Sequence, residues 1–162
     1  MQGKVVRLMD RETEREIWKR VQGTTSLNAE ESLLPERLEQ LVEAQKQTAA
    51  AQRQLAQRMG GGARSALRQM AAENEKDASE LTALYYLMTG RRLRLKAKAE
   101  PLPRDPSEAI RALWSRERKT AQDSAELARS FSAEAADFSQ LRARAERRQT
   151  RLARILGDRF RQ

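Results

Sequence analysis

The stretch LRQMAAENEKDASELTALYYLM, residues 67–88, decides the fold. Its apolar residues recur in steps of three and four, which places them on one face of a helix. That face is apolar from Leu67 and again from Leu81, but it is polar at its centre, at Asn74 and Asp77. An apolar helix face with a polar centre is typical of a helix that lines a site inside a bundle.

Three other segments repeat this pattern of apolar ends and a polar centre. Their polar midpoints are Gln45, Thr48 and Gln52 in the first segment, Glu117, Thr120 and Ser124 in the third, and Arg148, one turn after Ala145, in the fourth. Four amphipathic helices of this kind predict an all-α four-helix bundle with a polar layer across its middle.

Glycine, proline and capping residues set the predicted helix boundaries. Glycines 60–62 separate the first two long helices, which are expected over residues 35–59 and 63–89, and Gly90 is expected to cap the second. Asp105 and Pro106 predict the start of the third helix, which runs to about Phe131. Ser132 is expected to cap the fourth, which runs to about Arg159.

The N-terminal residues predict a further element. Residues from Asp10 to Gln22 are expected to form a short extra helix, followed by a loop over residues 23–27. We therefore expect residues 1–32 to form an N-terminal helix and loop, and residues 33–162 to form a single bundle domain.

A long linker over residues 91–105 joins the two predicted helix pairs. An extended chain covers roughly 3.3 Å per residue, so this linker can span about 43 Å. A helix of about 25 residues is about 37 Å long. The linker can therefore cross the whole length of the bundle, although a loose loop between antiparallel neighbours is an alternative.

Aligning the four helices on their turns brings six positions to one level of the bundle: Gln45, Asn74, Asp77, Glu117, Ala145 and Arg148. The two helix pairs also repeat each other, because the spacing from position 45 to 74 nearly equals that from 117 to 145. We take these six positions as the candidate site.

The motif LTALYYLMTGRR, residues 81–92, together with the basic, proline-containing linker and the closing LARILG, resembles small rubrerythrin-like bacterial proteins of the ferritin-like superfamily. The resemblance covers roughly residues 33–157. It implies a ferritin-like bundle with one long crossover. It also implies a di-iron site built from one Glu on each of the first and third helices and a Glu-x-x-His pair on each of the other two.

Carried over residue by residue, the resemblance places those ligands on Gln45, on Asn74 and Asp77, on Glu117, and on Ala145 and Arg148. Only Glu117 keeps the family's residue. A register one residue later would place the fourth-helix pair on Glu146 and Gln149, but the heptad stripe argues against it. We therefore expect that the di-iron centre is lost and that the chain has no cofactor. The alternative is weak iron or manganese binding by Asp77 and Glu117.

The interpretation of the polar layer depends on Arg148, the one basic residue among its polar positions. Its guanidinium stays protonated at physiological pH. It is therefore expected to face Asp77 and Glu117 as a cation supplied by the protein, with nearby amides and hydroxyls donating further hydrogen bonds. The alternative is that Arg148 extends to solvent and the layer is loosely packed and wet.

Composition limits the chemistry of the chain. Its 162 residues contain no cysteine and no histidine, which excludes disulfides, thiolate nucleophiles, zinc ribbons and an imidazole general base. Neither a signal peptide nor a membrane-spanning stretch is evident, so a cytoplasmic location is expected. The net charge is +9, which permits an anionic partner without demonstrating one.

These observations predict a non-catalytic, rubrerythrin-like protein with a structural or interaction role. One alternative is an oxidoreductase of the ferritin-like class that still binds iron or manganese, and another is a basic bundle associated with nucleic acid. A homodimer through helix faces is a further expectation, as is an anionic partner along a basic stripe on the last helix, whereas a membrane partner is not expected. The stripe consists of Arg144, Arg147, Arg151 and Arg154.

Overall fold

The structure, a computed structural model, describes residues 11–95 and 100–162, and of residues 11–32 it describes only the backbone. The chain divides into two compact units, residues 1–34 and residues 35–162, and each is described by itself. In the first unit, residues 11–34 are helical throughout. The second unit is a four-helix bundle, and the described residues contain no β-strand.

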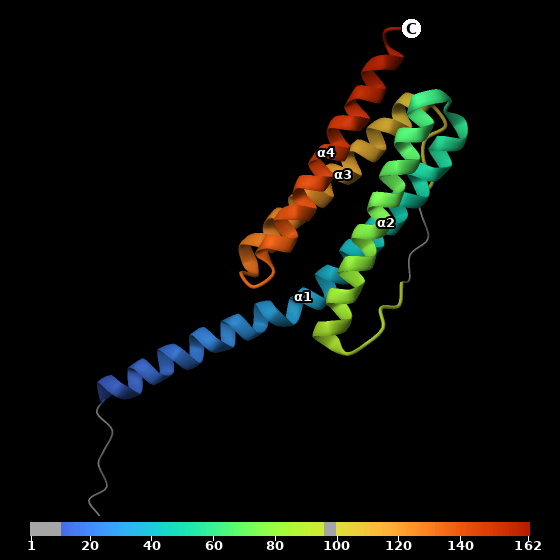
Figure 1. Cartoon of the computed structure of the whole chain (residues 1–162). Helices are drawn as coiled ribbons and strands as arrows, with labels where there is room; N and C mark the ends of the chain where they lie inside the picture. The colour runs from blue at the N-terminus through green and yellow to red at the C-terminus, as the bar shows by residue number, and fades with distance from the viewer. Residues whose placement is uncertain (1–10, 96–99) are drawn as a thin grey trace, which may run out of the picture. The chain divides into compact units, whose positions relative to one another are not determined.

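Four helices account for most of the described chain (Figure 1): α1 is Arg11–Arg58, α2 is Gly61–Thr89, α3 is Pro106–Ser130 and α4 is Ala135–Arg159. From Pro35 onward, α1 pairs with α2 as one hairpin, and α3 pairs with α4 as another. The prediction of an all-α four-helix bundle is confirmed.

The prediction of a separate short N-terminal helix is wrong. Residues 11–34 belong to α1 without the expected loop over 23–27, and Pro35 lies inside the helix instead of in its first turn. The predicted cap, Asp10, lies outside the described residues. The prediction ended the short helix at Gly23 and began the first long helix at Pro35, because inside a helix these residues cost about 1 and 3 kcal/mol relative to alanine, yet α1 continues through both.

The helix ends follow the local sequence at two of three predicted caps. Gly90 has φ 66°, the left-handed conformation that glycine adopts readily, and its N–H donates to a carbonyl in the last turn of α2. The Asp105 carboxylate accepts a hydrogen bond of 2.9 Å from the N–H of Glu108. Ser132 is not the cap of α4, because that position falls on Glu134, which makes no side-chain capping bond.

Neighbouring helices in the bundle run antiparallel. Between α1 and α3, the Nε2 of Gln45 donates to Thr120 and the Nε2 of Gln52 donates to Glu117, so residue numbers rise on one helix as they fall on the other. Between α2 and α4, ion pairs that join Glu73 to Arg151 and Asp77 to Arg144 show the same order. It follows that α2 and α3, which lie diagonally opposite, run parallel.

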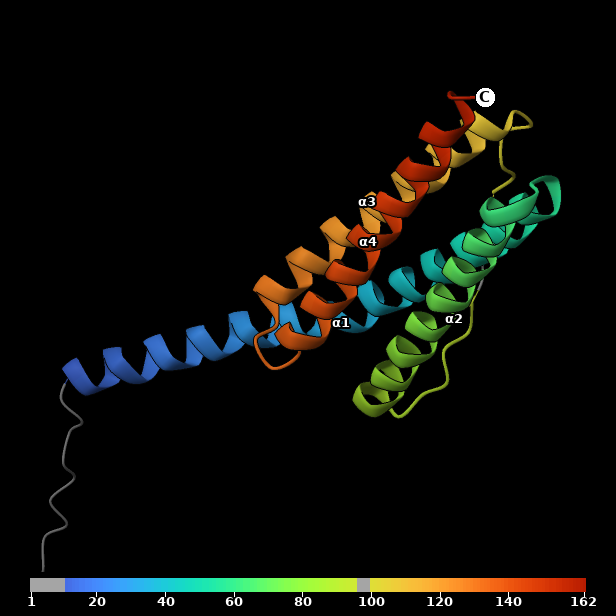
Figure 2. The same cartoon turned by 45° about the horizontal axis from the view of Figure 1, so that its top comes forward.

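Because α2 and α3 run parallel, the end of α2 and the start of α3 lie at opposite ends of the bundle (Figure 2). Residues 96–99 of the segment between them lie outside the described residues. Its final part lies beside the end of α1, where the Nη1 of Arg58 donates to the carbonyl of Pro103 at 3.0 Å. Leu102 from the same part is buried with the core.

The core is apolar at both ends of the bundle. Near the turn between α1 and α2 it contains Leu55, Leu67, Met70, Ile110, Leu113 and Leu152. Toward the opposite end, buried apolar residues include Leu38, Leu41, Leu81, Leu127, Phe138 and Leu141. Within the part of the chain that the structure describes, no helix has the length and hydropathy to span a bilayer.

Candidate functional site

Polar side chains from all four helices cross the middle of the bundle, between its two apolar ends. Each is at most 4% exposed. We call these side chains the polar layer: Gln45, Thr48, Gln52, Asn74, Asp77, Glu117, Thr120, Ser124 and Arg148. Heptad spacing places them there, because each continues the stripe of apolar residues that packs its helix into the core.

All six positions that the sequence singled out are buried at this level, each at most 1% exposed. Four of them form one connected network: Asn74, Asp77, Glu117 and Arg148. Gln45 is not part of this network and instead donates to the Oγ1 of Thr120 at 3.1 Å. Ala145 is buried but has no polar side-chain atom.

The guanidinium of Arg148 forms the centre of the network and has no exposed surface. Its Nε lies 3.0 Å from both carboxylate oxygens of Glu117. Its Nη2 lies 2.9 Å from Asp77 Oδ2, and its Nη1 lies 3.9 Å from Glu73 Oε2. One cation on α4 therefore bridges carboxylates on α2 and α3, as the sequence predicts.

Two amide side chains complete the surroundings of Glu117. The Nδ2 of Asn74 donates to Glu117 Oε1 at 2.7 Å, and the Nε2 of Gln52 donates to the same oxygen at 3.1 Å. Asn74 Nδ2 also donates to Gln52 Oε1 at 3.0 Å, which links α1 to α2. Asn74 is one of the hydrogen-bonding groups predicted around Arg148, together with Gln45, Thr48 and Thr120, whereas Gln52, one turn beyond Thr48 on the same stripe, was not predicted as a donor.

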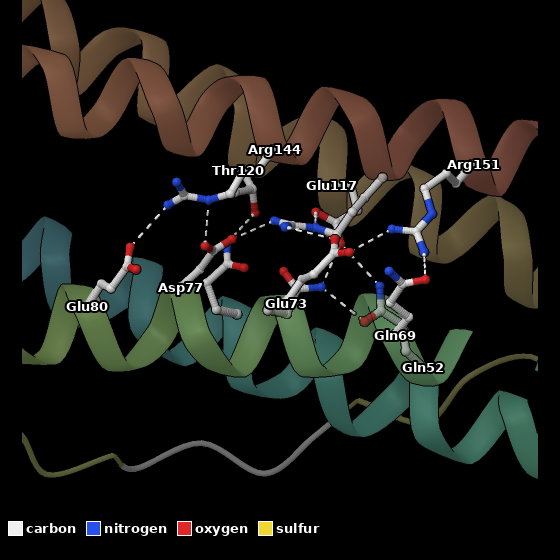
Figure 3. A network of polar contacts seen from close by, with 12 residues as sticks. Gln52, Gln69, Glu73, Asp77, Glu80, Glu117, Thr120, Arg144 and Arg151 are labelled. Carbon is white, nitrogen blue, oxygen red and sulfur yellow. Dashed lines mark hydrogen bonds and ion pairs between the residues drawn. The ribbon is translucent and has the colours of Figure 1, made fainter. Parts of the chain in front are cut away.

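Two further arginines on α4 extend the network toward α2 (Figure 3). Arg144 Nε lies 2.7 Å from Asp77 Oδ1, and its Nη2 lies 3.3 Å from Glu80 Oε2. Arg151 Nη1 lies 2.8 Å from Glu73 Oε1. Both arginines were predicted as part of the basic stripe on the last helix, without their partners Asp77 and Glu73. The spacing of Glu73, Asp77 and Glu80, which puts these three acids on one side of α2, is the sequence signal for this pairing.

Several buried atoms of the layer lack a hydrogen-bond partner among the described residues: Gln45 Oε1, Asn74 Oδ1, Asp77 Oδ2, and both Nη atoms of Arg148. The contact between Arg148 Nη2 and Asp77 Oδ2 is thus an ion pair without the alignment of a hydrogen bond. A buried polar group without a partner costs about 1–3 kcal/mol. Charge attraction, without a hydrogen bond, therefore holds Arg148 Nη2 beside Asp77 Oδ2.

Burial shifts the titration of the two central carboxyls. Desolvation raises the pKa of Asp77 above its ordinary 3.8 and the pKa of Glu117 above its ordinary 4.5, because a buried carboxylate loses its hydration. The charge of Arg148 opposes this shift at both residues, and the charge of Arg144 opposes it at Asp77. Desolvation is the larger effect at each.

We predict that these two carboxyls make the free energy of unfolding fall as the pH rises. A carboxyl with a higher pKa in the folded state binds its proton more tightly there. Its contribution is therefore complete below the ordinary values of 3.8 and 4.5 and is lost as the pH rises through the folded-state pKa. The free energy of unfolding, measured by urea denaturation from below pH 3.8 up to neutral pH, checks the prediction.

The variant Glu117→Gln isolates one of the two carboxyls, because glutamine cannot titrate. The difference between the wild-type and variant pH profiles gives the slope that is due to Glu117. If that difference increases with pH instead of decreasing, the raised pKa of Glu117 is refuted.

The donor set does not fit the di-iron centre that the resemblance implies. The chain has no histidine, and Glu117 alone matches the implied ligands. Among residues 33–95 and 100–162 no group of three or more His, Cys, Asp or Glu side chains is arranged to hold a metal ion. The guanidinium of Arg148, within 3.0 Å of Asp77 and Glu117, would repel a dication.

Comparisons of this chain with protein-family models, with curated proteins and with solved structures find no match.

Proposed function

We propose that the protein is a non-catalytic helical bundle with a structural or interaction role, in which Arg148 takes the place of a metal centre. The observation that carries this proposal is the complete burial of Arg148 between Asp77 and Glu117. The antiparallel helix pairs and the long connection over residues 90–105 support a ferritin-like ancestry, in which the six aligned positions correspond to former metal ligands.

The chemistry of the layer favours a structural role over catalysis. Its charged side chains are paired with one another, and each is at most 1% exposed, so a substrate in solution has no contact with them. A guanidinium keeps its proton at physiological pH and so does not serve as a general acid or base. In Glu117, both carboxylate oxygens already face Arg148.

Metal loading tests this proposal. We expect purified protein that has been incubated with Fe²⁺ or Mn²⁺ and then desalted to retain far less than one metal ion per chain by elemental analysis. We also expect its melting temperature to be the same with and without metal, because a ligand raises the melting temperature only if it binds the folded state. Stoichiometric retention of either metal, or a clear rise in melting temperature, would overturn the proposal.

A further inference from the structure

A cavity of about 690 Å³ lies at the end of the bundle where the turn between α1 and α2 meets the C-terminal part of α4. Four arginines line it: Arg58, Arg151, Arg154 and Arg159. Glycines 60–62 form another part of its wall. We call this the arginine-lined cavity. Arg151 is the one residue that it shares with the extended network, and Arg148, Asp77 and Glu117 do not line it.

The cavity has an excess of positive charge. Arg58, Arg154 and Arg159 form no ion pair with a carboxylate among the described residues, whereas Arg151 is paired with Glu73. Asp158 is the one acidic residue that lines the cavity. A concave surface lined with one sign of charge concentrates ions of the opposite sign, so the cavity is suited to an anion.

Stabilisation of a helix end accounts for the positions of Arg58 and Arg159, but not for the position of Arg154. Arg58 and Arg159 lie in the last turns of α1 and α4, where a cation stabilises the negative end of the helix dipole. Arg58 Nη1 also donates to the carbonyl of Pro103 at 3.0 Å. Arg154 lies more than one turn before the end of α4, is exposed, and has no side-chain partner among the described residues.

The glycine turn leaves room for a ligand beside the arginines. A Cβ atom added at Gly60, Gly61 or Gly62 would meet no other atom within 4 Å. The helix α2 begins here without a side-chain cap and without an acidic residue in its first turn. Its first backbone N–H groups therefore remain available as additional donors to an anion held by the arginines.

We propose that the arginine-lined cavity binds a small molecule that carries two or more phosphate groups. Guanidinium groups donate in a planar fork, and phosphate oxygens accept from several directions at once, so arginines from α1 and α4 can share one ligand. The cavity volume lies in the range of small-molecule pockets, about 300–1,000 Å³. Nucleic acid would instead require an extended basic surface.

Calorimetric titration with sodium pyrophosphate at low ionic strength tests this proposal. Arg154→Gln removes the one unpartnered arginine of the cavity, and we expect it to weaken binding about tenfold, the effect of one lost charge-assisted contact. Arg147→Gln is the matched control. Arg147 lies two turns earlier on α4, is equally exposed and free of ion pairs in the described structure, and does not line the cavity. We expect this variant to bind within twofold of wild type.

Three results would overturn the proposal. The first is that the wild-type protein does not bind pyrophosphate. The second is that Arg147→Gln weakens binding as much as Arg154→Gln, which would assign the binding to diffuse surface charge. The third is that a single-stranded oligonucleotide binds more tightly than pyrophosphate and displaces it, which would identify nucleic acid as the ligand. None of these results bears on the pairing of Arg148 with Asp77 and Glu117, because none of these three residues lines the cavity and neither Arg154 nor Arg147 contacts them.

Discussion

Replacement of Arg148 with alanine is expected to lower the free energy of unfolding by about 3–5 kcal/mol. The substitution removes the cation that lies 2.9 Å from Asp77 and 3.0 Å from Glu117, while both carboxylates stay buried. Asp77 keeps its ion pair with Arg144, but Glu117 keeps only its two amide donors. A buried charge that has lost its partner is the main source of the expected destabilisation.

Urea denaturation at neutral pH, followed by circular dichroism, measures this loss. Arg147→Ala is the matched control, because Arg147 is the adjacent arginine on α4 but is exposed and has no ion pair in the described structure. The control is expected to change the free energy of unfolding by no more than about 0.5 kcal/mol. A similarly small change for Arg148→Ala would show that the guanidinium does not support the layer.

The double variant Arg148→Met with Glu117→Leu is expected to be more stable than either single variant. Arg148→Met leaves the buried Glu117 carboxylate without its cation, and Glu117→Leu leaves the buried Arg148 guanidinium without its closest anion on α3, although Asp77 stays 2.9 Å away. Each is expected to destabilise the fold, by up to about 3–5 kcal/mol. The double variant removes both charges together and replaces them with apolar side chains of similar size. Asp77 keeps Arg144, and Asn74 keeps its hydrogen bond to Gln52.

A double-mutant cycle gives the size of this effect. The double variant is more stable than either single variant only if the coupling energy exceeds the larger single cost, so we expect a coupling energy of at least about 5 kcal/mol between Arg148 and Glu117, above the usual range for residues in direct contact. The layer already contains buried polar atoms without partners, so an apolar replacement also removes some of that cost. Additive losses in the double variant would mean that the two side chains do not act as an ion pair.

The sequence was sufficient to predict the polar layer because heptad position and burial are linked. The stripe residues Leu67, Met70 and Leu81 must face the core of the bundle, and the same face carries Asn74 and Asp77. The C-terminal end of α2 and the start of α3 were also predictable. Gly90 ends the first and the Asp105-Pro106 pair begins the second through interactions with neighbouring residues in the sequence alone.

Other features depended on contacts that local sequence does not contain. From the sequence, Arg144 and Arg151 appeared to lie on a solvated stripe of α4. That they instead face α2 becomes evident only when the acidic residues of α2 are placed opposite them. Ser132 is a good cap by residue type, yet α4 starts beyond it. At the N-terminus, Gly23 and Pro35 lower helix stability but do not forbid a helix, so α1 runs through both.

The ion pairs between α2 and α4 also bear on how the two helices are positioned along their common axis. An apolar seam of Leu and Ala residues packs almost equally well after a shift of one helical turn, about 5.4 Å. Such a shift would separate Arg144 from Asp77, Arg151 from Glu73, and Arg148 from Asp77. The charged residues thus specify a single alignment of the helices, in the way that a buried polar residue fixes the register of a coiled coil.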